Sequence, residues 1–259
     1  MKKILKRILI GTILTTVISF GSIATLILYP QLLFAEKVVY KDFNIYSNNP
    51  LPDTYKSAID YAIEVIKTSE IYESGHQLDI FLCHGTFYND FDTKLLGFAL
   101  AKSLHDNILL KVPVDFDKNI LIGWNSERNL KKTIAHEAIH FYQMNKYGMT
   151  RFSPITHPPS WKGEGYPEYV AYQKDIKSND YDLIESITKI KEFEKKGEYW
   201  FPTEPGQLDP LVYYKGRVMI EYLIDIKGMT YTEILHDSVT EEKVIEEMTV
   251  WYERQKSKE

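Results

Sequence analysis

Residues 136–140 are His-Glu-Ala-Ile-His, within a segment whose apolar residues repeat with helical periodicity. This apolar stripe predicts a helix over residues 127–146 and consists of Leu130, Ile134, Ala138 and Phe141. His136 and His140 are four positions apart, so on a helix their imidazoles lie about 40° apart in projection and can reach one metal ion. The pattern therefore predicts a metal site on this helix.

Glu137 lies on the adjoining flank of the same helix, where its carboxylate can reach a metal-bound water without binding the metal. Zinc lowers the pKa of such a water toward ~7, and a carboxylate can then accept the proton. A helix with two solvated surface histidines shows the same five-residue pattern. Residues elsewhere in the chain must therefore distinguish the two interpretations.

A catalytic zinc ion needs a third protein ligand, and the chain offers two candidates. His157 lies in a proline-rich loop, and Glu164 lies in Trp-Lys-Gly-Glu-Gly-Tyr-Pro-Glu-Tyr, residues 161–169. Pro167 fits only the first turn of a helix, which places Glu164 at the helix start. Glu168 is one turn further on the same face and suits a hydrogen bond to the outer nitrogen of a ligand histidine, although a solvated helix acid is the alternative.

Three motifs taken together resemble those of the gluzincin metallopeptidases. They are His-Glu-x-x-His, the 161–169 segment, and Tyr-Tyr-Lys-Gly at residues 213–216. The chain is most similar to the small peptidase MA-like branch and to the catalytic domains of aminopeptidase N-type and thermolysin-like enzymes. The resemblance covers about residues 95–230 and implies a zincin-like fold.

The resemblance also implies roles for individual residues. His136, His140 and Glu164 would bind one Zn²⁺ per chain, and Glu137 would be the general base. Tyr213 would hydrogen-bond the oxyanion that forms in the transition state, with Tyr214 as the alternative.

The chain departs from the family pattern at two places. Pro167 stands where the small branch usually has alanine. The Gly-x-Met-Glu-Asn strand that binds the free amine in aminopeptidases is missing, and the expected active-site edge strand, residues 119–124, contains no acid. Exopeptidase specificity is therefore not supported, although an edge strand can hold an extended peptide by β-addition.

The rest of the chain predicts an α+β fold, because strands come first and helices follow. A mixed-sheet half with the metal-site helix (36–147) precedes a mostly helical half (148–259), and residues 36–259 form the predicted metallopeptidase domain. The predicted strands are 37–47, 78–83, 95–101, 107–112 and 119–124, with a helix from 53 or 54 to 69 and a polar loop over 84–92. The later predicted helices are 164–177, 181–197, 209–227 (capped by Asp209-Pro210) and 230–256 with breaks, separated by loops over 147–163 and 198–208.

The N-terminus predicts a membrane anchor. Residues 8–28 carry no charge and would form a helix about 32 Å long, enough to cross a bilayer. The basic residues before them, Lys2, Lys3, Lys6 and Arg7, favour a cytoplasmic N-terminus and an extracytoplasmic body. A retained signal-anchor over residues 1–35 is the favoured interpretation. A cleaved signal, giving a secreted protein, and a buried core helix are the alternatives.

Charge and cysteine content exclude other classes. The chain has 31 basic and 36 acidic residues; residues 36–259 therefore carry 27 − 36 = −9, which argues against nucleic-acid binding. One cysteine, Cys83, excludes an intramolecular disulfide framework and a cysteine-rich zinc module. The sequence thus predicts a membrane-anchored zinc metallopeptidase acting on a peptide or protein substrate. The alternatives are a membrane-tethered, non-catalytic zinc-binding or assembly protein and a zinc hydrolase of a non-peptide amide.

Overall fold

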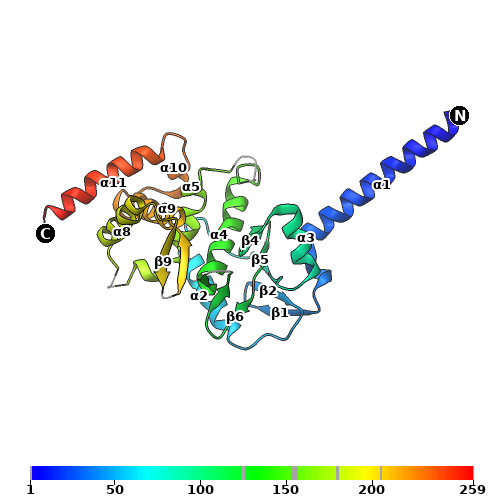
Figure 1. The fold of residues 1–259 in the computed structure, drawn as a ribbon, viewed down its shortest axis with the longest axis horizontal. Helices are drawn as coiled ribbons and strands as arrows, with labels where there is room; N and C mark the ends of the chain where they lie inside the picture. Colours follow the sequence, from blue (N-terminus) through cyan, green and yellow to red (C-terminus); the bar gives the residue numbers. More distant parts are fainter. Residues whose placement is uncertain (1, 124–125, 153–156, 179–180, 205, 259) are drawn as a thin grey trace.

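The computed structural model describes residues 2–123, 126–152, 157–178, 181–204 and 206–258, and it is an α+β structure with two mixed sheets and a long N-terminal helix (Figure 1). The helices are α1 (Lys2–Leu28), η1 (Pro30–Leu33), α2 (Tyr55–Ile66), α3 (Phe87–Leu96), α4 (Leu130–Tyr147), α5 (Ser160–Gly163), α6 (Gly165–Ala171), α7 (Gln173–Ile176), α8 (Leu183–Lys196), α9 (Leu211–Glu221), the π-helical turn η2 (Tyr222–Ile226), α10 (Tyr231–Ile234) and α11 (Glu241–Lys256). The strands are β1 (Glu36–Tyr40), β2 (Phe43–Ser47), β3 (Leu78–Leu82), β4 (Ala101–Leu104), β5 (Asn107–Leu110), β6 (Val114–Asp115), β7 (Ile120–Ile122), β8 (Glu127–Asn129), β9 (Trp200–Glu204) and β10 (Gln207–Pro210).

The first sheet has the strand order β1-β2-β3-β5-β4, with β2, β3 and β5 parallel and the two edge strands antiparallel to their neighbours. Its central strands carry apolar residues on both faces, as expected for strands covered on both sides, although Asn44, Asp79 and Asn107 pair across one face. Ile80 and Ile108 face the main core with α2 and α4, whereas Phe81 and Leu109 face a second cluster with Tyr88 of α3. This sheet is therefore a middle layer, with helices α2 and α4 on one face and helix α3 on the other.

The second sheet has the order β6-β7-β8-β10-β9 and joins segments far apart in the chain. β8 runs directly into α4, and β10 runs directly into α9. These two strands pair in parallel, with Gln207 opposite Glu127. Helices α4 and α9 therefore start at the same end of one sheet.

The structure confirms the type and approximate position of several predicted elements: α2, β3, β5, β7, α8, α9 with η2, and α10 with α11. The prediction that residues 119–124 form an active-site edge strand is wrong, because β7 lies between β6 and β8. Trp124 lies outside the described residues. Within the described residues, the sheet edge nearest α4 is instead β4, which pairs with β5 alone.

Two predictions in the first half are corrected. The predicted strand 37–47 is a hairpin of β1 and β2, because Lys41 has a φ of +53° and turns the chain. Helix α3 covers most of the predicted loop 84–92 and only the first two residues of the predicted strand 95–101, and β4 begins at residue 101. Thr86 begins α3 by accepting a hydrogen bond from the Asn89 N–H, and Gly97 ends it with a φ of +85°.

The second half also differs from prediction. The predicted loop 198–208 contains the β9–β10 hairpin, in which Pro202 is tolerated because β9 is an edge strand. Pro205 and residues 153–156, also expected in loops, lie outside the described residues. The helix predicted over 127–146 begins only at Leu130, because the three preceding residues pair as β8. The helix predicted over 164–177 is a series of short helices, α5, α6 and α7, beginning at Ser160.

Helix α1 is long and apolar enough to cross a membrane by length and composition, with a mean hydropathy of 1.9 over Lys6–Leu28. A signal sequence meets the same criteria, so the retained anchor stays a prediction. The helix projects away from the rest of the molecule (Figure 1). Its last turn is attached to the body, since Asn107 Nδ2 donates to the Leu28 carbonyl at 3.0 Å.

Candidate metal centre

The two histidines of the motif lie on one buried face of α4. Asn129 begins this helix, and its side-chain oxygen accepts a hydrogen bond from the Lys132 N–H at 3.2 Å. Two turns later the ring nitrogens Nε2 of His136 and His140 lie 3.1 Å apart. Both imidazoles therefore face a common point, as the spacing predicts.

Glu164 completes a triangle with these two nitrogens. Its Oε2 atom lies 3.3 Å from Nε2 of His136 and 3.3 Å from Nε2 of His140. Zinc–ligand bonds of about 2.0–2.1 Å in a tetrahedral site place neighbouring ligand atoms about 3.3 Å apart. The three atoms thus have the separations of one face of a tetrahedral site, and this group could hold a small divalent metal ion.

His157 is not part of this group. Its Nδ1 atom lies 2.9 Å from the carbonyl oxygen of Pro158, and its ring packs directly on the backbone of Gly163. Glu164, rather than His157, therefore joins the two histidines.

Glycines from two of the motifs explain how Glu164 reaches this position. Gly165 follows Glu164 at the start of α6, and Gly216 belongs to the Tyr-Tyr-Lys-Gly motif on α9. A Cβ atom on Gly165 would lie 2.6 Å from the carbonyl carbon and oxygen of Gly216, closer than real contacts allow. The close crossing of α6 and α9 requires a residue without a side chain, and it brings Glu164 and Tyr213 to the same site.

Gln143 is a site residue that the sequence interpretation missed. It is fully buried on α4, and its Oε1 atom lies 2.8 Å from Nδ1 of His140. Its Nε2 atom donates to the Gly163 carbonyl at 3.0 Å. That carbonyl is free for this bond because the residue four positions later is Pro167, which has no N–H. The signal in the sequence was a glutamine three residues after His140, on the same face of the helix.

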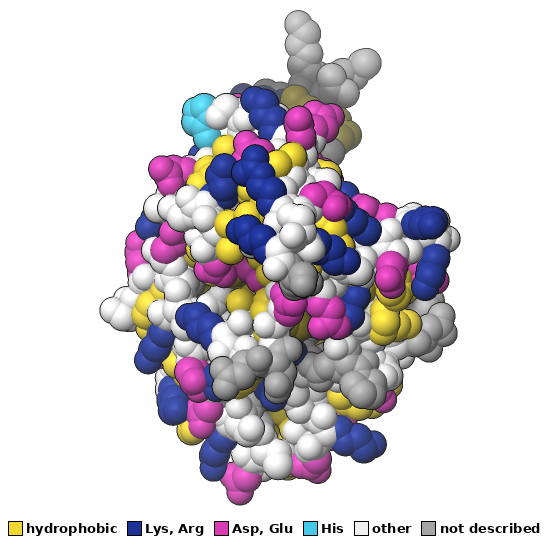
Figure 2. All heavy atoms as spheres, turned by 90° about the vertical axis from the view of Figure 1, so that its left-hand side faces the viewer, with side chains coloured by type: hydrophobic (Ala, Val, Ile, Leu, Met, Phe, Trp, Pro, Cys, Tyr) yellow, Lys and Arg dark blue, Asp and Glu magenta, His cyan; other side chains and the backbone are white. Residues whose placement is uncertain are grey.

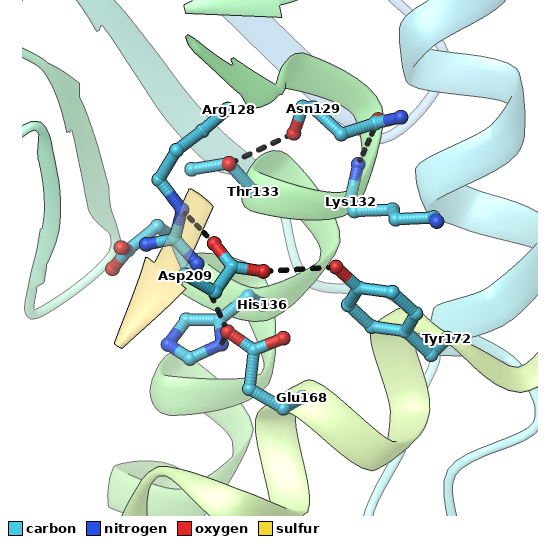
Figure 3. Close-up of a pocket in the computed structure, with 9 residues that line it drawn as sticks. Arg128, Asn129, Lys132, Thr133, His136, Glu168, Tyr172 and Asp209 are labelled. Atoms are coloured by element: carbon cyan, nitrogen blue, oxygen red, sulfur yellow. Dashed lines mark hydrogen bonds and ion pairs between the residues drawn. The ribbon is translucent and has the colours of Figure 1, made fainter. Parts of the chain in front are cut away.

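The outer nitrogen of His136 faces a network of charged residues (Figure 3). Its Nδ1 atom lies 3.3 Å from Oε1 of Glu168, within ion-pair distance but without hydrogen-bond geometry. Arg128 of β8 bridges Glu168 at 3.1 Å and Asp209 of β10 at 2.7 Å. Asp209, expected to cap α9, instead binds Arg128 and accepts a hydrogen bond from the Tyr172 hydroxyl at 3.0 Å. Glu168 is thus held beside His136 rather than in solvent.

The electrostatic environment favours a positive charge at the triangle. Burial lowers the pKa of His136, but the carboxylates of Glu168 and Glu164 more than offset this and raise it to about 10. Burial works to raise the pKa of Glu164, yet the two histidines hold it well below its usual range. Burial also raises the pKa of the Glu137 carboxyl. Because the carboxylates attract a cation here, the donor atoms and the local field both fit a divalent metal.

The triangle lies in a groove of about 680 Å³. Residues of β4 and Tyr213 of α9 are among its lining, together with His136, Glu137, His140 and Glu164. The Tyr213 ring lies 6.2 Å from the His136 ring, and burial together with Glu164 raises its pKa, so the hydroxyl keeps its proton for donation. Tyr214 instead stacks on Phe201 at 3.7 Å. The groove therefore brings together a metal-binding group, a carboxylate and a phenol donor.

Comparisons with known proteins give no assignment, since no protein-family model, curated protein or solved structure matches this chain.

Proposed function

We propose that this chain is a membrane-anchored zinc metallopeptidase with a zincin-like fold. The observation that carries the proposal is the triangle of His136, His140 and Glu164 with ligand atoms 3.1–3.3 Å apart, in one groove with Glu137 and Tyr213. The gluzincin resemblance assigns metal binding to the triangle, the role of general base to Glu137 and oxyanion stabilisation to Tyr213.

The proposed chemistry is hydrolysis of a peptide bond. His136, His140 and Glu164 would hold a zinc ion, which would supply Lewis acidity to the substrate carbonyl and to the attacking water. Glu137 accepts the proton of the attacking water and passes it to the departing amine, because its carboxylate lines the same groove as the three metal-binding residues. Tyr213 donates a hydrogen bond to the carbonyl oxygen as this oxygen gains negative charge. Gln143 orients the His140 imidazole through a hydrogen bond, and the Glu168 carboxylate lies beside the outer nitrogen of His136 at ion-pair distance.

The edge strand β4 supports a peptide as the substrate. It lines the same groove as the metal-binding group, and in the part of the chain that the structure describes it pairs with β5 alone. An extended peptide can pair with such an edge through backbone hydrogen bonds, which places a peptide bond near the catalytic groups. We expected residues 119–124 to pair with the peptide, and we now propose residues 101–104 for this pairing.

Helix α1 supports the proposed location. Its apolar stretch is long enough to span a bilayer, and the basic residues precede it in the sequence. By the positive-inside rule, the groove would then lie outside the cytoplasm.

Glu137→Gln tests the proposal in the full chain, purified in detergent micelles and loaded with zinc. The substitution removes the base and keeps all three metal-binding residues. We expect it to retain about one zinc ion per chain and to lower hydrolysis of a quenched peptide library by at least about 10²-fold. The matched control is Glu192→Gln, an exposed position on α8, which should match the wild type.

Two results would contradict the proposal. Zinc-loaded wild-type protein that cleaves none of the library would favour the non-catalytic alternative, or an amide outside peptides. Full activity in Glu137→Gln would assign proton transfer to another residue.

A further inference from the structure

The groove extends to the point where α1 joins the body. Its lining includes Leu28, the last residue of α1, and Phe98, between α3 and β4. The Tyr88 hydroxyl of α3 donates to the Ile27 carbonyl of α1 at 3.2 Å. The ring of Phe34, just after η1, packs against Tyr88 with ring centroids 6.3 Å apart. Helix α3 therefore lies beside the residues through which α1 leaves the body (Figure 1).

The outward side of α3 carries an apolar stripe beside the exposed Asp90 and Lys94. Phe87, Phe91 and Leu95 recur at every fourth position and so form a single stripe on the helix. Phe87 is 70% exposed and Leu95 49% exposed, and the rings of Phe87 and Phe91 stack with centroids 6.2 Å apart. Lys94 borders the stripe, where a long cationic side chain can reach lipid headgroups.

The inward side of α3 is fixed to the sheet that carries the groove. Asp92 is buried and makes ion pairs with Lys111, just after β5, and with Lys102 of β4 at 2.7 Å. A surface that holds α3 would therefore also hold β4, which lines the groove.

The opposite end of the molecule has a different surface. There, over the end that carries α8 and α11, Lys and Arg side chains are interspersed with Asp and Glu, and hydrophobic side chains form only small areas (Figure 2). Such a mixed charged surface is typical of contact with water. The apolar stripe of α3 thus lies at the end of the molecule from which α1 emerges (Figure 1).

We propose that the apolar stripe of α3 (Phe87, Phe91 and Leu95) is a lipid-docking surface that holds the groove against the bilayer crossed by α1. The inference rests on the membrane anchoring in the proposed function and is independent of catalysis. Lipid is the occupant because the stripe adjoins the end of an apolar helix, which brings it to the membrane surface in every molecule. An amphipathic helix with aromatic and aliphatic residues on one side and a flanking lysine is suited to that interface.

Depth measurements in the full chain, reconstituted into phosphatidylcholine vesicles, test this proposal. Leu95→Cys and Val250→Cys, each labelled with a polarity-sensitive fluorophore, form a matched pair, because these residues are 49% and 47% exposed on α3 and α11. Val17→Cys reports on α1 itself. The native Cys83 stays unlabelled, because burial raises the pKa of its thiol to about 12.

We expect lipids carrying a quenching group to quench the Val17 and Leu95 probes, the latter at least about threefold more than the Val250 probe. Quenching at Val17 alone would overturn the lipid-docking surface and leave the anchor in place. Blue-shifted emission at Leu95 without lipid quenching would mean that another protein chain covers the stripe, which also overturns the proposal. Absence of quenching at Val17 would overturn the anchor and the docking surface together. Hydrolysis of a soluble peptide, measured on the same samples, reports on the catalytic proposal separately.

Discussion

The Oε1 atom of Gln143 lies 2.8 Å from Nδ1 of His140, and the amide nitrogen of the same side chain donates to the Gly163 carbonyl, next to Glu164. The Gly163 carbonyl oxygen can only accept a hydrogen bond, so it must face the NH₂ group of Gln143. The amide oxygen of Gln143 therefore faces the histidine. Nδ1 of His140 must then carry the hydrogen, which leaves Nε2 free to bind a metal. One buried amide thus orients His140 relative to Glu164.

We predict that Gln143→Leu lowers zinc affinity by about 10–100-fold, because it removes the group that fixes the His140 tautomer. Competition with a chromogenic chelator measures this affinity. Gln173→Leu is the matched control, since Gln173 is also a buried glutamine and its amide bonds to the Tyr169 carbonyl instead. Equal zinc affinity in the two variants would show that Gln143 only fills space.

Substitutions of Glu164, at the start of α6, and of Glu168, within α6, should have different effects on the amount of bound metal. Glu164→Ala removes an atom of the triangle, so we expect protein with little bound zinc. Glu168→Ala leaves the triangle intact and removes the partner of His136 Nδ1, so we expect zinc-loaded protein with impaired turnover. Metal analysis and peptide hydrolysis on both variants check this pair. The reverse order of zinc contents would place the third ligand one helical turn further along the chain.

Adjacent tyrosines on α9 give a matched test of oxyanion stabilisation. Tyr213 lines the groove, whereas Tyr214 stacks on Phe201. Tyr213→Phe should lower kcat by roughly 10²-fold with little change in KM, because the hydrogen bond is used in the transition state. Tyr214→Phe keeps the stacked ring and should stay within about threefold of wild type. An effect of Tyr213→Phe on KM alone would assign this tyrosine to substrate binding.

A buried carboxyl on α9 predicts pH-dependent stability. Burial raises the pKa of Glu221 to about 7, although Arg217 opposes the shift. The folded protein therefore holds this proton at pH values where the unfolded chain has lost it. The contribution of this group to the free energy of unfolding is complete below about pH 4.5 and is lost as the pH rises through about 7, by at most about 3 kcal/mol.

Glu221→Gln tests this linkage, because glutamine stays neutral and can still accept the hydrogen bond from Tyr181. The variant should gain stability relative to wild type between pH 5 and pH 8, as measured by urea unfolding in detergent micelles. Glu246→Gln, at an exposed position on α11, should show no such gain. A constant difference between Glu221→Gln and wild type across this range would mean that Glu221 is ionised in the folded protein throughout.

Local sequence determined those elements whose side-chain periodicity or capping residue lies within a few neighbouring residues. The helical spacing of His136 and His140 places both rings on one side of α4 without reference to any other segment. The same holds for the uncharged stretch of α1 and for α8, where Asp182 accepts a hydrogen bond from the Ile184 N–H at the helix start. The choice of Glu164 over His157 also followed from the sequence, through the position of Pro167 and the resemblance of three motifs.

Tertiary structure alone decided the relationships between distant segments. Periodicity could not reveal that β8 pairs with β10, that Gly165 meets Gly216, or that β4, unlike β7, is an edge strand that lines the groove. The predicted strand over 95–101 failed for a related reason. Its apolar residues Leu95 and Leu96 end helix α3, and a short apolar run has the same pattern in either structure. Side-chain period is a property of neighbours in the chain, whereas strand order and helix crossings depend on burial and backbone pairing between residues that meet only when the whole chain folds.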